Sequence, residues 1–426
     1  MIAGVVIGAL VLAIATARRP WVPLAVVVVI ALALSTGSSR QLGMSVHPAV
    51  VLTFAVLAVQ LVREPRAVLS DVARMLGVVV CFGAFILATA LFSWSAGRTD
   101  SYGLVVTQVI APAVLLFLVR RAVTSDARNG VVLLRVLVWA CVAEAVLVLL
   151  VANGLVPQPN LALVSGARWF EDDPERAVGT LDHPLVAGVW LAAAIPAAAV
   201  IRTGWLRLAA SAVLFAAVLL TGARTAVVIA AIALLLLVLR STAAPLARIA
   251  LVLVVLTVGA LLVSGPLGAT TLGRFADDGG SSTARGKALA LALEVLPGSF
   301  LRGGGVSSSE HVTRDALLPS TFENPLIVST IDFGGVFTLL FFGALVALVL
   351  AGRRTAAVPE ARLAAVAAFL GVMGFNSFGA PSTVGFLVFV VVALAAPPSS
   401  GCRVSDVPQE HAVAPARTSA GLGGAR

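Results

Sequence analysis

An acidic residue and an amide stand side by side just before a long apolar run. Glu323 and Asn324 precede the run at 325–350, and Asp332 follows inside it. A carboxylate at such a junction can take a proton from a substrate hydroxyl, so Glu323 is a candidate general base and Asn324 a candidate substrate ligand. The alternative is that both residues cap the helix that begins there. Asp332 is of interest because buried acids within spans are rare and usually functional.

Two arginines lie beside other apolar runs. Arg176 comes a few residues before the run at 185–201, in a segment that also contains His183. Arg224 stands in a short turn between the runs at 208–221 and 225–239. Arginine pairs with phosphate through two parallel hydrogen bonds, so Arg224 is a candidate catalytic residue, and Arg176 and His183 are candidate substrate ligands. The alternatives are neutralisation of Arg176 by the acidic residues before it, and contact of Arg224 with lipid headgroups.

A third basic segment contains Arg285 and Lys287, which is the only lysine of the chain. Further along, Arg302 is followed by the three consecutive glycines 303–305. Closely spaced cations and a glycine cluster suit close approach to a phosphate group, although glycine-rich segments are weak signals in isolation. Arg285 is therefore a candidate catalytic residue, and Lys287 and Arg302 are candidate substrate ligands. A flexible loop is the alternative.

No metal or cofactor is expected. The four histidines have no metal-ligand spacing, and none of the three cysteines lies in an extracytoplasmic segment. Glu144 lies within the predicted span at 131–152, and we interpret it as a polar contact inside the bundle.

Composition indicates that membrane-spanning helices position these residues. Of the 426 residues, 60% are hydrophobic and 12% are charged, and the mean hydropathy is +1.06. A soluble domain has about 25% charged residues, so a soluble enzyme and a disordered chain are excluded. The apolar residues form unbroken runs such as 25–34 and do not alternate, which excludes a β-barrel. The net charge of +9 comes mainly from arginines spread over short loops, so topology explains it better than nucleic-acid binding.

The fold class is therefore an all-α, polytopic transmembrane bundle of about 12 or 13 spans. The apolar runs that predict them are 2–16, 21–35, 47–62, 75–92, 103–119, 131–152, 185–201, 208–221, 225–239, 249–265, 325–350, 361–375 and 383–397.

Arginines concentrate in alternate short loops. Cytoplasmic loops of membrane proteins carry the excess of basic residues, so these loops are predicted to be cytoplasmic. They contain Arg18, Arg19, Arg63, Arg66, Arg74, Arg120, Arg121, Arg128, Arg202, Arg207, Arg240, Arg248, Arg353, Arg354 and Arg362. The opposite short loops contain Arg40, Arg98 and Arg224. The two long polar stretches are then extracytoplasmic and the C-terminus is cytoplasmic.

These boundaries divide the chain into four parts. N-terminal spans occupy 1–151, and a catalytic region occupies 152–350, including the outer loops 152–184 and 265–324. C-terminal spans occupy 351–397, and a disordered cytoplasmic tail occupies 398–426. In the larger loop, 283–296 is predicted to be an amphipathic helix with Leu289 and Leu293 on its apolar face.

The polar segments, in this order, resemble those of the bacterial O-antigen ligase and O-antigen polymerase superfamily. The resemblance covers about 165–350 and rests on loose motifs: Arg176 followed by Gly179-Thr180, the turn Thr221-Gly222-Ala223-Arg224, Arg285 with Pro297 and the glycines 303–305, and Glu323-Asn324 followed by Asp332-Phe333-Gly334-Gly335. Glu323 stands where the ligases have a histidine, which favours a polymerase or another exopolysaccharide transferase over a ligase.

The resemblance implies a metal-independent, inverting glycosyltransferase in the bacterial plasma membrane. Its donor would be a lipid-linked oligosaccharide on a polyprenyl pyrophosphate, and its acceptor a hydroxyl of a glycan, lipid or protein. Outer-face arginines would stabilise the departing pyrophosphate. Partners would be other proteins of an envelope polysaccharide assembly system.

Two other function classes remain open. One is a transporter or flippase for lipid-linked glycans, although the internal repeats typical of such proteins are not evident. The other is a non-catalytic scaffold of envelope assembly, which would tolerate loss of the outer arginines.

Overall fold

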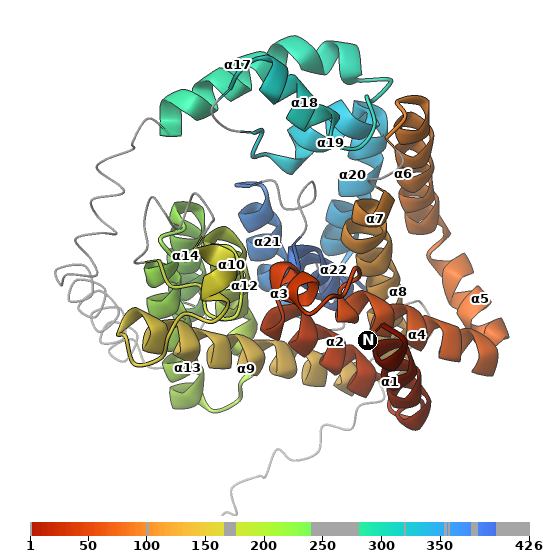
Figure 1. Cartoon of the computed structure of the whole chain (residues 1–426). Coiled ribbons are helices and arrows are strands. Elements are labelled where there is room, and N and C mark those ends of the chain that lie inside the picture. Colours follow the sequence, from red (N-terminus) through yellow and green to blue (C-terminus); the bar gives the residue numbers. More distant parts are fainter. Residues whose placement is uncertain are drawn as a thin grey trace, which may run out of the picture.

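The computed structural model describes residues 2–98, 102–165, 176–239, 281–318, 321–352, 356, 358–375 and 382–397. These residues form helices and no strand, which confirms the predicted all-α fold (Figure 1). Twelve of the thirteen predicted apolar runs are helical. The run at 249–265, the acidic segment 166–175, the beginning of the larger loop and the tail at 398–426 lie outside the described residues.

The first half of the chain contains the helices α1 (Ile2–Ala15), α2 (Trp21–Ala33), α3 (Thr36–Gln41), α4 (Pro48–Arg63), α5 (Pro65–Arg74), α6 (Leu76–Ser95), α7 (Tyr102–Val105), η2 (Val106–Ile110), α8 (Ala111–Ser125), α9 (Ala127–Ala152) and α10 (Leu161–Val164). The second half contains α12 (Pro184–Ala197), η3 (Ala198–Val200), α13 (Gly204–Thr221), α14 (Arg224–Leu239), α17 (Ser281–Ser299), α18 (Ser308–Asp315), α19 (Pro325–Phe333), α20 (Gly335–Ala351), α21 (Ala361–Val372) and α22 (Val384–Ala395).

Four helical segments are long and apolar enough to cross a membrane. They are α6, the continuous segment Tyr102–Ser125, α9 and α13. The pair α4 and α5 qualifies as a fifth only if it is taken as one span, and it is bent by 113° at Glu64. Seven further apolar helices are 10 to 17 residues long. The chain is therefore compatible with a multi-pass membrane protein, and the number of spans stays a prediction.

The predicted single span at 325–350 is wrong in one respect, because the structure divides it into α19 and α20. Gly334 separates the two helices and has a positive φ of 91°, a backbone conformation that L side chains rarely adopt. Its N–H still closes α19 on the Thr330 carbonyl, whereas the Val336 N–H donates to the carbonyl of Phe300. Asp332 therefore ends a short helix and does not lie in the middle of a long one.

The centre of the fold consists of helices with small or β-branched residues. α12 and α22 are buried along almost their whole length. α12 packs against α9, α13, α14 and α21. At Gly188, a Cβ atom would lie within 3 Å of the Cβ atoms of Ala223 and Ala226. Glycine and alanine thus allow α12 and α14 to approach closely, as is common between membrane helices.

Three hydrogen bonds join segments that are far apart in sequence. The Gly37 N–H donates to Asp182 at 2.9 Å, and the Arg98 guanidinium donates to the Val306 carbonyl at 3.3 Å. The Arg120 guanidinium donates to the Pro397 carbonyl at 3.0 Å.

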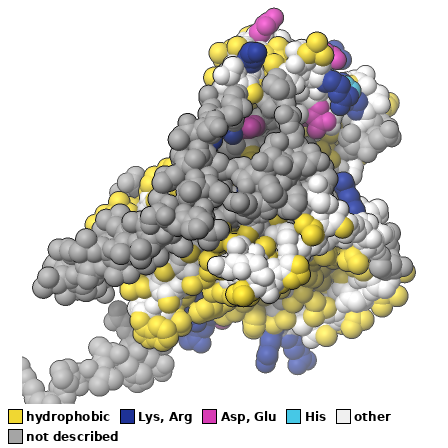
Figure 2. Space-filling view, turned by 60° about the vertical axis from the view of Figure 1, so that its left-hand side comes forward, with side chains coloured by type: hydrophobic (Ala, Val, Ile, Leu, Met, Phe, Trp, Pro, Cys, Tyr) yellow, Lys and Arg dark blue, Asp and Glu magenta, His cyan; other side chains and the backbone are white. Residues whose placement is uncertain are grey.

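Polar and apolar side chains are separated on the face of the molecule that Figure 2 shows. Figure 2 shows basic side chains along the lower edge of the molecule, a belt of apolar side chains above them, and both acidic and basic side chains at the top. α17 and α18 form this top in Figure 1.

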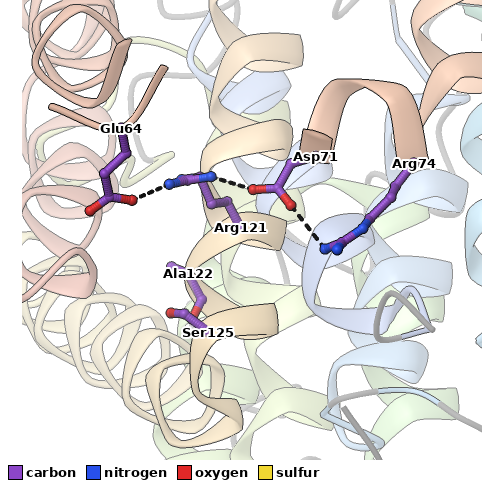
Figure 3. Close-up of polar contacts among 6 residues, drawn as sticks. All are labelled: Glu64, Asp71, Arg74, Arg121, Ala122 and Ser125. Carbon is purple, nitrogen blue, oxygen red and sulfur yellow. Dashed lines mark hydrogen bonds and ion pairs between the residues drawn. The ribbon is translucent and has the colours of Figure 1, made fainter. Parts of the chain in front are cut away.

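A charged cluster ties α5 to α8 (Figure 3). Arg121 lies between Asp71 and Glu64 and forms an ion pair with each, and Asp71 also accepts from Arg74 at 3.3 Å. The Arg121 side chain is 12% exposed, whereas that of Glu64 is 60% exposed. The cluster therefore holds the amphipathic α5 across the end of the bundle.

We expect the two acids of this cluster to differ in importance. Asp71→Ala should lower the free energy of unfolding by about 1–3 kcal/mol, because a mostly buried guanidinium loses its better-shielded partner. Glu64→Ala should cost less than about 1 kcal/mol, because exposed ion pairs contribute little. Thermal unfolding of the detergent-purified variants measures both, and equal losses would contradict this ranking.

Candidate functional site

Three of the predicted polar segments meet at the 373–375 turn, which follows α21. The Asn324 side-chain amide donates to the first carbonyl of this turn at 3.4 Å. The Thr225 hydroxyl lies against its glycine, where a Cβ atom would be only 3.1 Å away. The His183 ring stacks on its phenylalanine, with 6.4 Å between ring centroids and 8° between planes. Segments that lie far apart in sequence therefore contact one short stretch of backbone.

The segment that contains Arg285 is joined to Glu323, next to Asn324, by an ion pair. The Arg285 Nε donates to the Glu323 carboxylate at 2.8 Å. The side chains are 53% and 35% exposed, so the pair is open to solvent on one side. Asn324, not Glu323, caps α19, since its Oδ1 accepts from the Leu326 N–H at 2.9 Å. The capping alternative is thus right for Asn324, and Glu323 remains at the surface beside an arginine.

Arg176 joins its own segment, which also contains His183, to the short turn that contains Arg224. Its Nε donates to the Thr221 carbonyl at 2.8 Å, at the C-terminus of α13. A cation is favourable there because the helix dipole places partial negative charge on the last carbonyls. The next residue, Gly222, has a positive φ of 63° and ends the helix. Arg224 then begins α14 and is half-buried.

His183 is uncharged at neutral pH. Its Nδ1 accepts from the Leu185 N–H at 3.2 Å and caps α12. Burial, and to a smaller extent the neighbouring Arg176, lower the pKa of His183 from 6.5 to about 4. The ring therefore brings no positive charge to this place at neutral pH.

This pKa predicts a pH dependence of stability. Because the folded pKa is lower than the unfolded one, stability is complete above pH 6.5 and is lost as the pH falls towards 4, by at most about 3 kcal/mol. His183→Asn should remove this dependence and keep the helix cap. Thermal unfolding between pH 4 and 7 measures the difference, and equal acid sensitivity of both proteins would contradict the prediction.

The amphipathic helix predicted over 283–296 is present as α17, but its buried face differs from the prediction. Ala288 and Ala292 are buried against α19, whereas Leu289 and Leu293 are exposed. The face was misassigned because leucine is the more hydrophobic residue, while close packing of α17 on α19 requires the smaller alanine. Lys287 lies on the exposed side of this helix.

The glycines 303–305 serve close packing of backbones. The N–H groups of Gly304 and Gly305 donate to the carbonyls of Ile331 and Asp332 at 2.9 and 2.8 Å. A Cβ atom at Gly303 would overlap the backbone of Asp332. These N–H groups are therefore already used by α19. Arg302, just before them, is exposed.

Asp332 has a positioning role that follows from the same contact. Its carboxylate accepts from the N–H groups of Ser307 and Ser309 at 3.2 and 2.7 Å and so caps the N-terminus of α18. α19 thus carries Glu323 and Asn324 at one end and the acceptor for α18 at the other.

Glu144 is hydrogen-bonded to Thr180, which lies in the polar segment that begins with Arg176. Its carboxylate accepts from the Thr180 N–H at 2.6 Å and from the Thr180 hydroxyl at 2.9 Å. This confirms an intrabundle polar contact. A carboxylate within an apolar run signals that a partner exists, but nothing in the sequence identifies a threonine 36 residues away.

The described residues contain no group of three or more histidine, cysteine or acidic side chains that could hold a metal ion. What they offer is an arginine–carboxylate pair beside a capped helix, with two more arginines on the segments that meet at 373–375. No protein-family model matches the chain, and no curated protein matches its sequence.

Proposed function

We propose that this protein is a membrane glycosyltransferase of the O-antigen ligase and polymerase type, which transfers or polymerises a glycan from a polyprenyl-pyrophosphate donor. The observation that carries the proposal is the meeting of the four polar segments. The turn at 373–375 contacts the segments of His183, Thr225 and Asn324. Glu323, next to Asn324, forms an ion pair with Arg285 of the remaining segment. These are the segments on which the family resemblance rests.

The chemistry requires a proton acceptor and stabilisation of a leaving anion. The acceptor hydroxyl oxygen would attack the anomeric carbon while the bond from that carbon to the pyrophosphate oxygen breaks. The bonding electrons would leave with the polyprenyl pyrophosphate, and Glu323 would take the hydroxyl proton. Arg285 and Arg224 would stabilise the departing charge, with Arg176 and Lys287 binding the donor. Attack opposite the leaving group inverts the anomeric centre.

The ion pair suggests a sequence of binding events. The Arg285 Nε lies 2.8 Å from one oxygen of the Glu323 carboxylate, so the two side chains occupy each other. A donor pyrophosphate would compete with this carboxylate for Arg285. Glu323 would then be free to accept the proton of an acceptor hydroxyl after the donor has bound.

A flippase for lipid-linked glycans is the second candidate. The break between α19 and α20 and the π-helix η2 favour it, because interrupted helices line the binding sites of many transporters. A flippase would move the donor across the membrane without lengthening its glycan, and it would not need Glu323.

The purified protein in proteoliposomes with a polyprenyl-pyrophosphate oligosaccharide tests the proposal. A polymerase produces a ladder of longer glycans and releases polyprenyl pyrophosphate, and a ligase gives a single product when an acceptor is added. Transbilayer movement of the donor without extension would establish the flippase instead.

The proposal also fixes the sides of the membrane. The donor is used on the extracytoplasmic face, so α17 and α18 should lie outside and α5 in the cytoplasm. In a cysteine-free background, Leu317→Cys should react with an impermeant maleimide in intact cells. Ser70→Cys should react only after lysis. Both positions are exposed in the structure. The reverse pattern would reject this topology.

A further inference from the structure

We propose that a cavity beside α3 binds the headgroup of a zwitterionic phospholipid, in which a phosphate and a primary ammonium lie close together. The cavity has a volume of about 550 Å³ and lies among the α3–α4 connection, the α7–η2 segment, the beginning of α18 and the beginning of α22. Such a volume is in the ordinary range of ligand-binding cavities. None of the residues predicted as site residues lines it, so this site is separate from the proposed function.

The cavity contains one guanidinium and one carboxylate that the protein itself does not use. Arg40 of α3 and Glu310 of α18 are the acidic and basic side chains of its lining besides His47. Both ring nitrogens of His47 are already engaged, with the Leu34 carbonyl and the Ala49 N–H. Among the described residues, Arg40 and Glu310 form no ion pair with each other, and neither side chain has a hydrogen bond. The lining therefore complements a ligand that carries one charge of each sign.

Glu310 is not needed to cap its own helix. An acidic side chain in the first turn commonly interacts with the free N–H groups of the helix N-terminus. At α18 the carboxylate of Asp332 takes this place, because it accepts from the N–H groups of Ser307 and Ser309 at 3.2 and 2.7 Å. Glu310 is half-buried, and its unpaired carboxylate is not sealed off by surrounding atoms. A ligand in the cavity can therefore reach it, and a charged donor would offset the cost of its partial burial.

The chemistry of the two charged side chains selects the groups of the ligand. A guanidinium binds phosphate oxygens through two parallel hydrogen bonds, and a carboxylate accepts from the N–H groups of an ammonium. A quaternary ammonium has no N–H to donate, and proteins bind it with several aromatic faces. The described lining offers only the Phe386 ring and the engaged ring of His47. A phosphate and a primary ammonium in one molecule fit this lining.

The position of the cavity favours a lipid over a free phosphoethanolamine. Residues of the cavity lie at the beginnings of three apolar runs that are predicted to be spans, 47–62, 103–119 and 383–397. Headgroups lie at the ends of such spans. The glycerol and the first methylene groups of a lipid would also contact the apolar part of the lining. This part consists of Met44, Val46, Val50, Leu104, Val106 and Phe386.

Native mass spectrometry of the full chain in lipid-free detergent tests the binding. Phosphatidylethanolamine should remain bound to the protein. Phosphatidylglycerol lacks the ammonium and should bind at least about tenfold more weakly, the value of one hydrogen bond to a charged group. Water-soluble O-phosphoethanolamine should not displace the lipid at equal concentration. Equal binding of the two lipids, or displacement by phosphoethanolamine at equal concentration, would overturn the proposal.

The two charged side chains should act differently on the two lipids. Arg40→Gln should weaken the binding of both, because both contain the phosphate. Glu310→Gln should weaken phosphatidylethanolamine about tenfold and leave phosphatidylglycerol unchanged or bound more tightly, because the removed carboxylate repels an anionic lipid. Arg314→Gln and Asp315→Asn are the matched controls, since they remove exposed charges of α18 that do not line the cavity. They should change neither affinity.

The proposal is wrong if Glu310→Gln weakens both lipids alike, or if a control variant weakens phosphatidylethanolamine as much as Glu310→Gln does. Unfolding of Glu310→Gln in lipid-free detergent would also count against it, because the protein itself would then depend on the carboxylate. None of these measurements uses glycan transfer, so failure of the proposed function leaves the lipid site untouched.

Discussion

Glu323→Gln should reduce glycan transfer by about 10²–10⁴-fold while the protein still folds and binds its donor. The amide keeps the shape of the side chain but cannot take the proton of an acceptor hydroxyl. The fold should tolerate the change because the ion pair with Arg285 is partly exposed, and exposed pairs contribute at most about 1 kcal/mol. Extension of a lipid-linked glycan in membranes measures the loss.

Two further variants distinguish the loss of a general base from the loss of donor binding and from the mere removal of a surface carboxylate. Arg285→Ala should weaken donor binding as well as rate, because phosphate contacts act in both the ground state and the transition state. Glu294→Gln removes an exposed carboxylate from α17, the helix that carries Arg285, and should leave activity unchanged. If Glu323→Gln has near-normal activity, Glu323 is only the partner of Arg285 and the general base must be sought elsewhere.

The helices were predictable because their signal is local. An unbroken apolar run identifies a membrane helix without reference to the rest of the chain, and the run at 75–92 appears as α6 at Leu76–Ser95. The break at Gly334 was not predictable in this way. Both sides of it are apolar, and the positive φ of Gly334 occurs where the backbone from Phe300 to Gly305 packs on α19.

The order of the polar segments was also apparent, but their pairing was not. Arg285 binds a carboxylate 38 residues away, and Arg176 binds a backbone carbonyl 45 residues away. Acidic residues close to Arg176 in sequence offered a plausible local partner, and a carbonyl has no sequence signal at all. Long-range pairs depend on how the helices pack, which periodicity and composition do not determine.

Gly303→Ala should be the most damaging single-methyl change in the candidate site. The new Cβ atom would overlap the backbone of Asp332, and a backbone cannot move aside as a flexible side chain can. Overpacking of this kind costs about 1–3 kcal/mol. It should also push α19 away and displace Glu323, and a shift of about 1 Å at a reacting group can reduce the rate about 10²-fold.

Gly286→Ala provides the control on the same polar segment. Gly286 lies inside α17 with no atom near its hypothetical Cβ, so alanine should leave stability unchanged or raise it by up to about 1 kcal/mol. The two variants should therefore differ in both measurements. Gly303→Ala should lower the unfolding temperature and the extension of the glycan, and Gly286→Ala should lower neither. If Gly303→Ala loses transfer but unfolds at the wild-type temperature, the glycine is needed for approach of the substrate and not for packing on α19. If both variants behave like the wild type, neither glycine positions Glu323, and α19 is held by the Asp332 cap of α18 and by the contact of α17 through Ala288 and Ala292.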